Sequence, residues 1–294
     1  YEGGDSIANR IATLCEHVSA EDLAALAVKA RHDYKLRHAP LWLCRQMLRL
    51  HSGPIVGDTI ARVVHRPDEA AELIAIYWRD RKPGNPKQLR AQLKRGLALA
   101  FRKWDAYQLA KWNRDNAIKL RDVLFLCHPK PESEEQVALW KQLVDDTLPA
   151  PLTWEVELSK GADKRTTWER LIAEKKLGYM ALLGNLRNME EARVDNGLIK
   201  DALIAGAAKS WALPYRFIAA ARAVPQFEAM LEQAMLVALG VQAKLPGRTI
   251  LVVDVSGSMA QALGWKTDMS RIDAACGLAM LVREVTEDAA IYAT

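Results

Sequence analysis

The sequence predicts a mostly α-helical protein that passes, towards residue 294, into the beginning of an α/β domain. Through residues 6–239, apolar residues recur at helical spacing in short runs separated by Pro- or Gly-containing turns. No strand-like alternation is visible there, so short helices in antiparallel pairs indicate an α-solenoid, whose repeats are degenerate because no strict period is present. The pattern changes at residues 245–248, which predicts two domains, residues 1–244 and 245–294.

Composition is that of an ordinary globular protein and limits where the chain functions. Apolar residues make up 50% and charged residues 26% of the 294 residues, as in typical globular domains. No apolar run approaches the ~18 residues that cross a bilayer, so we expect no membrane partner. The first residues are neither basic nor apolar, so no signal peptide is visible, and the missing initiator Met predicts a fragment. We therefore expect a cytoplasmic protein.

The cysteines point to the same compartment. Cys15, Cys44, Cys127 and Cys276 are far apart in sequence, and none belongs to a Cys-x-x-Cys pair. Each has apolar neighbours, so we expect four buried, reduced thiols, which are typical of intracellular proteins. The lack of paired ligands argues against a zinc site.

Individual elements follow from the apolar periodicity and from capping residues. Ser19 and Pro40 mark helix starts within residues 6–51, and Trp104 is expected to fill the core at the end of an apolar helical stripe. The further predicted helices are residues 56–64, 66–78, 87–104, 107–113, 120–126, 134–145, 166–177, 178–188, 195–210, 214–223, 225–239 and 270–285. Strands are predicted at residues 250–253 and 289–293, which gives a strand–helix–strand unit.

An acid and two hydroxyls follow the first predicted strand. The run Ile-Leu-Val-Val at residues 250–253 predicts a strand buried on both faces. Asp254, Ser256 and Ser258 then alternate at its carboxyl end, where ligands collect in open α/β sheets, and Gly257 permits a tight turn. Their oxygens suit a hard cation that keeps its waters, Mg²⁺ before Ca²⁺. A serine-rich β-turn without a metal is the alternative.

Positive charge is concentrated in one segment. Residues 79–122 contain thirteen Lys or Arg against four acids, a net charge of +9, whereas the whole chain carries +5. Such a concentration favours a polyanionic partner such as RNA, because each cation displaces a counterion from a phosphate. Lys87, Arg90, Lys94 and Arg95 are predicted on neighbouring faces of one helix. Trp104, Tyr107, Trp112 and His128 are interleaved and are candidates for stacking on unpaired bases, although such Trp residues commonly fill cores.

Several blocks of sequence together resemble one family. They are Tyr-Glu-Gly-Gly at residues 1–4, Lys-Leu-Arg-Asp-Val-Leu at 119–124 leading to Cys-His-Pro-Lys-Pro at 127–131, and Leu-Gly-Tyr-Met-Ala-Leu-Leu-Gly-Asn-Leu-Arg-Asn-Met at 177–189. With the Asp-x-Ser-x-Ser sequence at residues 254–258, the chain resembles the TROVE-module family of the Ro 60 kDa ribonucleoprotein and its bacterial relatives. The last motif by itself resembles the metal-ion-dependent adhesion site of von Willebrand factor A domains.

The resemblance implies a fold and a function. It implies a ring of HEAT-like helical repeats (TROVE) followed by a partial α/β von Willebrand factor A-like domain that closes the ring. It also implies binding of small structured noncoding RNAs, the Y RNAs, on the outer surface, and of single-stranded 3′ ends of misfolded RNAs in the central hole. Such a protein acts in RNA quality control or processing. Bacterial relatives work with exoribonucleases such as polynucleotide phosphorylase.

The resemblance also implies RNA-contacting residues. Lys111 and His128 match basic positions of the family's outer RNA site, and Arg114 is close to a family Arg whose aligned place is taken by Asp115. For the central hole, charge alone suggests Arg31, Lys35, Arg37, His38 and Arg45. The family completes its metal site with a threonine and an acid on later loops that are not in this sequence, so we expect weak or absent Mg²⁺ binding.

No arrangement of residues predicts an enzyme. Ser256 and Ser258 lack the Gly-x-Ser-x-Gly context of a catalytic nucleophile, and no phosphate-binding Gly-x-x-x-x-Gly-Lys loop is present. The alternative to RNA binding is a metal-dependent protein-interaction scaffold without direct RNA binding. Salt dependence separates the two, because only phosphate contacts release counterions and weaken steeply as salt rises.

Overall fold

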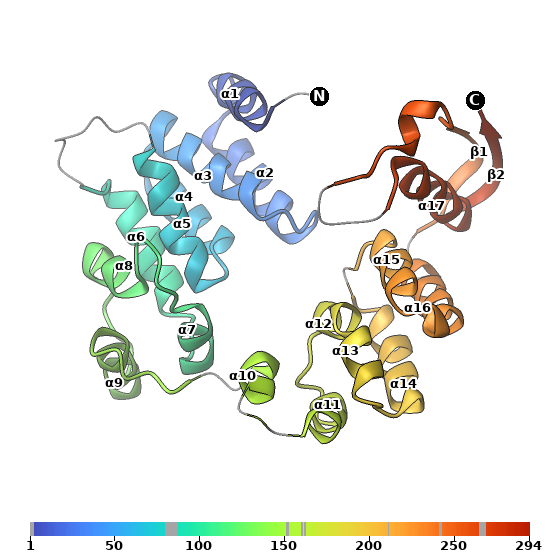
Figure 1. The fold of residues 1–294 in the computed structure, drawn as a ribbon. Helices are drawn as coiled ribbons and strands as arrows, with labels where there is room; N and C mark the ends of the chain where they lie inside the picture. The colour runs from blue at the N-terminus through green and yellow to red at the C-terminus, as the bar shows by residue number, and fades with distance from the viewer. Residues whose placement is uncertain are drawn as a thin grey trace. The chain divides into compact units, whose positions relative to one another are not determined.

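The computed structural model divides the chain into two compact units, Tyr1–Thr153 and Trp154–Thr294, called unit 1 and unit 2 here. The structure describes residues 3–79, 88–150, 153–159, 161, 163–210, 212–240, 243–264 and 269–294. Both units are built mainly of short helices, which confirms the predicted mostly α fold class (Figure 1). The predicted domain boundary between residues 244 and 245 falls inside unit 2, between the helix Glu228–Gly240 and the strand Leu245–Val253.

Unit 1 is an array of paired helices. It contains α1 (Gly4–Cys15), α2 (Ala20–His32), α3 (His38–Leu50), α4 (Pro54–Val63), α5 (Pro67–Trp78), α6 (Ala91–Phe101), α7 (Ala106–Trp112), α8 (Leu120–Cys127) and α9 (Glu134–Val144). Local chemistry sets the starts: Ser19 Oγ accepts from Asp22 N at 3.1 Å, Pro54 and Pro67 begin their helices, and Asp105 caps α7.

The core of unit 1 follows the apolar stripes read from the sequence. Leu93, Leu97 and Phe101 of α6 are fully buried, and Trp104 is 2% exposed, which confirms its predicted core position. The Trp104 indole Nε1 donates to His65 O at 2.8 Å, so its one polar atom is satisfied. Phe101 contacts the Trp104 ring edge to face, at a centroid distance of 5.1 Å.

Unit 2 begins with a second helical array. It contains α10 (Trp154–Ser159), α11 (Lys164–Ala173), α12 (Tyr179–Gly184), α13 (Leu186–Glu191), α14 (Asn196–Ala207), α15 (Tyr215–Ala223), η1 (Pro225–Phe227) and α16 (Glu228–Gly240). The sequence did not predict α10. The single helix predicted over residues 178–188 is two helices, because Asn185 leaves the helical conformation and serves as the cap between them.

A parallel strand pair completes the described part of unit 2. It consists of β1 (Leu245–Val253), η2 (Gly257–Ala260), α17 (Arg271–Glu284) and β2 (Thr286–Ala293). The two strands pair in parallel, with Val253 opposite Ala293, and α17 packs against both. The predicted strand–helix–strand order is therefore present.

Two burial predictions were wrong. The strand at residues 250–253 is not buried on both faces: Ile250 and Val252 are 63% and 64% exposed, whereas Val253 is buried. The reason is that alternate side chains point to opposite faces, and α17 packs on one of them. Cys276 is exposed, whereas Cys15, Cys44 and Cys127 are buried as expected. Cys276 lies on α17, whose partly exposed surface also carries Leu278.

Candidate nucleic-acid interface

More than half of the described basic side chains of the +9 segment are already committed within unit 1. Arg79 pairs with Asp5, Arg95 with Asp58 and Arg102 with Glu132 at distances of 2.7–3.0 Å. Arg90 donates to Leu48 O and Lys103 to Ala61 O. These contacts hold helices together, so they reduce the positive charge that a partner can meet.

A smaller set of cations in the segment has neither an ion pair nor a hydrogen bond to a backbone carbonyl among the described residues. The set consists of Lys94, Lys111, Arg114 and Arg121. The last three are exposed, whereas Lys94 is half-buried. Lys111 closes α7, Arg114 lies in the following loop, and Arg121 is in the first turn of α8. The candidate interface is thus the α7–α8 junction and not the whole basic segment.

Trp112 organises these cations. The Arg114 guanidinium carbon lies 5.0 Å from the Trp112 ring centroid, and Lys111 Nζ lies 5.8 Å from it. Arg66 covers the same ring at 3.9 Å, but Arg66 also pairs with Asp68. Cations held over an indole face keep their charge while their aliphatic parts are packed, so Lys111 and Arg114 are positioned without being neutralised. Here Lys111, Trp112, Arg114 and Arg121 are called the α7–α8 cluster.

Asp115 does not neutralise Arg114. Its Oδ1 lies 2.6 Å from Lys119 Nζ, four residues later. The hydrogen bond and charge of Lys119 lower the pKa of the Asp115 carboxyl, so it is ionised and already paired. Asp115 therefore leaves Arg114 available to a partner.

Two surface hollows meet at Arg114. One, of about 370 Å³, is lined by Arg37 and Arg114 together with acidic and small residues of α5. The other, of about 350 Å³, is lined by Arg114, Lys119 and Arg121 with Asn113 and Asp146. The fold therefore brings Arg37 and Arg121 beside Arg114, although they are separated from it by 77 and 7 positions in sequence.

His128 ends α8 at the opposite end from Lys119. It is exposed and adopts a left-handed conformation with φ of 49° as the helix C-cap. Its N–H donates to Leu124 O at 2.9 Å. A helix of this length places His128 about 12 Å from the Lys119 end, so it does not share a hollow with Arg114. His128 is thus the C-cap of α8, and its ring stays open to a partner.

The helix-face candidates of α6 have structural contacts. Arg90 is its N-cap and reaches Leu48 O, and Arg95 reaches Pro54 O at 2.9 Å and Asp58. Lys94 is half-buried near Cys127, whose pKa is raised to about 12 chiefly by burial. Lys87 lies outside the described residues. RNA contact by these residues stays a prediction. The cations of the α7–α8 cluster have fewer contacts within the protein, so they are more available to a partner.

The cations suggested for a central hole hold α2, α3 and α5 together. Arg31 Nη2 donates to the buried Glu69 carboxylate at 2.6 and 2.9 Å. Arg37 pairs with Asp68 and Glu72 at 3.0 Å, and His38 Nδ1 lies 2.7 Å from Glu72. Arg45 is 4% exposed and donates to Ile76 O at 3.1 Å. Lys35 is exposed with φ of 53° after α2. Arg31 and Arg45 are therefore structural in this conformation.

The loop after β1 brings the three metal candidates together. Ser256 N donates to Asp254 Oδ1 at 2.8 Å, and Ser256 Oγ lies 3.2 Å from Ser258 Oγ. Hydrogen bonds from Ser256 and Thr294 lower the pKa of Asp254, which keeps it ionised. One carboxylate and two hydroxyls fit a hydrated hard cation, but they provide a single charge. Over the described residues, no group of three or more His, Cys, Asp or Glu could hold a metal ion.

Sequence reasoning missed two features of these surfaces. Arg121 was counted in the charged segment but not selected, and only the turn between α7 and α8 places it beside Arg114. A cleft between α11, α12 and α14 was also missed, because its walls are ordinary apolar helix residues. Among the described helices, none combines the length and apolar character needed to span a bilayer.

Comparison with known proteins found a family match over part of the chain. Residues 146–263 match the family model of the TROVE domain. This match covers less than half of the chain, and it agrees with the resemblance read from the sequence.

A solved structure has a fold similar to that of this chain. The crystal structure of the Deinococcus radiodurans RO (RSR) protein is similar to this chain with a TM-score of 0.63 and 19% sequence identity. The similarity covers 95% of this chain and 68% of that chain. No match was found among curated protein sequences.

Proposed function

We propose that this protein binds structured RNA through the α7–α8 cluster, as a ribonucleoprotein component in RNA quality control or processing. The observation that carries the proposal is that Lys111 and Arg114 flank Trp112 while neither has an acidic partner among the described residues. Arg offers flat, bidentate contacts to phosphate and Lys a point charge, and both displace counterions.

Stacking adds a second mode of contact at the same place. Tyr107 is 46% exposed on α7, and Lys111 Nζ lies 5.5 Å from its ring centroid. An exposed ring beside a cation suits an unpaired base with its phosphate. Trp112 is half-buried beneath Arg66 and Arg114, so its role is to hold the cations in place.

The finer assignments rest on the family resemblance. We propose that a small Y-like noncoding RNA occupies the outer surface, that single-stranded 3′ ends of misfolded RNA are a second substrate, and that an exoribonuclease such as polynucleotide phosphorylase is a partner. The positions of Lys111 and His128, both exposed, support the first assignment. For the metal loop we propose weak Mg²⁺ binding by Asp254, Ser256 and Ser258, supported by their convergence. Calorimetric titration with Mg²⁺ tests it, and tight binding retained in Asp254→Asn would contradict it.

Salt-dependent RNA binding tests the proposal directly. A labelled RNA hairpin with a single-stranded 3′ tail is titrated with the protein at several salt concentrations. Three phosphate contacts from the α7–α8 cluster predict a slope of log K against log salt of about −3. Lys111→Gln with Arg114→Gln is expected to flatten this slope by about 2 and to weaken binding at low salt.

Lys200→Gln is the matched control, because Lys200 is an exposed cation on α14 without an ion pair among the described residues. An unchanged slope in the double variant would remove the interface from the α7–α8 cluster. Absence of RNA affinity at ~50 mM salt would instead favour the alternative, a protein-interaction scaffold.

A further inference from the structure

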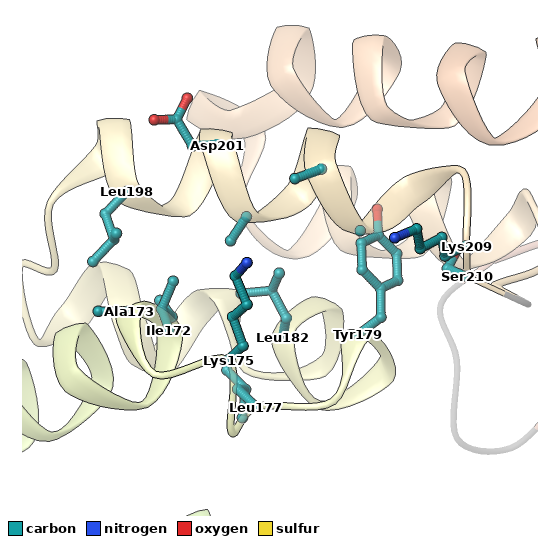
Figure 2. Close-up of a pocket in the computed structure, with 13 residues that line it drawn as sticks. Ile172, Ala173, Lys175, Leu177, Tyr179, Leu182, Leu198, Asp201, Lys209 and Ser210 are labelled. Carbon is teal, nitrogen blue, oxygen red and sulfur yellow. The ribbon is translucent and has the colours of Figure 1, made fainter.

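A separate cleft in unit 2 is not used by the proposed RNA interface. It has a volume of about 580 Å³ and is lined by residues of α11, α12 and α14 and the turns that follow α11 and α14 (Figure 2). This volume lies within the ~300–1,000 Å³ typical of ligand pockets. All of its lining residues belong to unit 2.

One wall of the cleft is a face of α14 made of small residues. Leu198, Ala202, Ala205 and Gly206 recur at helical spacing and extend over about 12 Å. Gly206 is required, because a Cβ there would lie 2.5 Å from the Tyr179 ring. The Tyr179 ring thus packs against Gly206, and the small side chains of Ala202 and Ala205 leave room for a ligand along the rest of this wall.

The opposite wall is aliphatic and comes from α11 and α12. Ile172, Leu177 and Leu182 line it, and Tyr179 stands at one end. The Tyr179 hydroxyl donates to Leu203 O at 2.9 Å, and burial raises the pKa of this hydroxyl to about 12. Because this hydroxyl is protonated and already donates to a backbone carbonyl, it has little capacity to hydrogen-bond to the edge of a nucleobase.

The polar groups at the rim are two lysines and one acid. Lys175, which follows α11 with φ of 55°, and Lys209, which follows α14, have no ion pair among the described residues. In Figure 2 the Lys175 ammonium lies between the two walls, and the Lys209 ammonium lies beside the Tyr179 ring. The Asp201 carboxylate points away from the other lining side chains in the same view. The cleft therefore presents positive charge between its two walls and beside Tyr179.

We infer that this cleft docks a short segment of a partner protein that carries aliphatic or aromatic side chains flanked by carboxylates. Aliphatic walls take such side chains, the small-residue face admits the backbone, and the lysines pair with the flanking acids. Single-stranded RNA fits less well, because the lining supplies one half-buried aromatic ring and few groups that could hydrogen-bond to bases.

A displayed library of random 12-residue peptides tests this site with the whole protein as bait. We expect enriched peptides to combine Leu, Ile or Phe with Asp or Glu. A synthetic peptide of the enriched sequence should bind at least tenfold more weakly to Lys175→Gln with Lys209→Gln. It should also bind at least tenfold more weakly to Ala205→Trp, in which an exposed position on the small-residue face is filled.

Lys200→Gln, an exposed change on α14 outside the cleft, should leave peptide affinity unchanged. Circular dichroism melting of each variant separates loss of the site from loss of the fold. No enrichment, enrichment without acidic residues, or equal affinity in all variants would overturn the inference. Loss of affinity for a single-stranded RNA oligonucleotide in the cleft variants, without peptide binding, would also overturn it and would make the cleft an RNA site.

Discussion

At the scale of single residues, Glu69 is the main ionic link inside unit 1. Its side chain is 1% exposed and accepts from Arg31 Nη2 and from the backbone N–H groups of His65 and Arg66, at 3.0 and 3.1 Å. Arg31 is itself only 13% exposed. A buried carboxylate with this many donors is satisfied, but each partner depends on the others.

Removing either partner of this pair should therefore destabilise unit 1. Arg31→Ala leaves Glu69 buried with one fewer donor. Glu69→Ala removes the acidic partner of Arg31 and the acceptor of two backbone N–H groups. Each change should lower the free energy of unfolding by about 3 kcal/mol. Urea unfolding measures this, with the exposed Glu16→Ala as control. Since the two changes break one contact, the double variant should cost less than their sum. Strict additivity would show that the pair is not coupled.

The basic residues of unit 1 show what the sequence could not reveal about the interface. Counting charge located the basic segment, and the resemblance selected Lys111, Arg114 and His128. Neither could show that Arg90, Arg95, Arg102 and Lys103 are consumed by carbonyl groups and acids from elsewhere in unit 1. Those partners are up to 42 residues away, and only the packed helices bring them into reach.

At the scale of elements, helix periodicity predicted most of unit 1, and the errors have local causes. Trp104 and the stripe on α6 are buried as expected, because a 3.6-residue period fixes the inward face. The fully apolar run of β1 was ambiguous, since apolar residues on both faces occur in buried strands but do not require burial. The helix α10 has six residues, too few for a periodic signal.

The close approach of α4 and α6 depends on two glycines. A Cβ on Gly96 would lie 2.6 Å from Ile60 Cβ and 2.7 Å from Gly57 O. Adding one would therefore push α4 and α6 apart and disturb the core. Gly96→Ala should lower the free energy of unfolding by about 1–3 kcal/mol, measured by urea titration. Gly184→Ala is the matched control, because nothing lies within 4 Å of its added Cβ, and it should be neutral or slightly stabilising. Equal stability of the two variants would contradict tight packing of α4 on α6.

The start of α17 should make stability depend on acid pH. Asp273 accepts from Ser270 N and Oγ in a capping box and pairs with Arg222 of α15 at 2.6 Å. The bonds from Ser270 and then Arg222 lower the pKa of Asp273 from 3.8 to about 2. As the pH falls, Asp273 therefore binds a proton in the unfolded chain before it does so in the folded chain. The stabilisation by Asp273 is present above pH 3.8 and is lost as the pH falls towards 2.

Asp273→Asn should remove that part of the pH dependence. Thermal unfolding between pH 5 and pH 2 measures it, with Asp288→Asn as a control of the same charge at an exposed site. If the variant and the unmodified chain lost melting temperature in parallel over this range, the assignment of the effect to Asp273 would be wrong.

At the scale of the whole molecule, two separate apolar cores are the main finding that the sequence did not anticipate. One contains Leu23, Phe101 and Leu143 and lies entirely in unit 1, and the other contains Trp168, Phe217 and Leu231 and lies entirely in unit 2. Both arrays are made of short helices, so nothing in the periodicity marks the change at residue 153. The stronger sequence signal, at residues 245–248, marks a change from helix to strand within unit 2.

This division makes unit 1 testable by itself. Because residues 1–153 contain a complete core and the whole α7–α8 cluster, that fragment should unfold cooperatively in urea and bind the RNA hairpin within about threefold of the full chain. Residues 154–294 contain neither Lys111 nor Arg114, so they should bind the hairpin weakly and with a shallower salt slope. Binding retained only by residues 154–294 would move the RNA interface out of unit 1. A folded fragment 1–153 with full affinity would place structured-RNA binding in unit 1 and leave unit 2 and its cleft for a different partner.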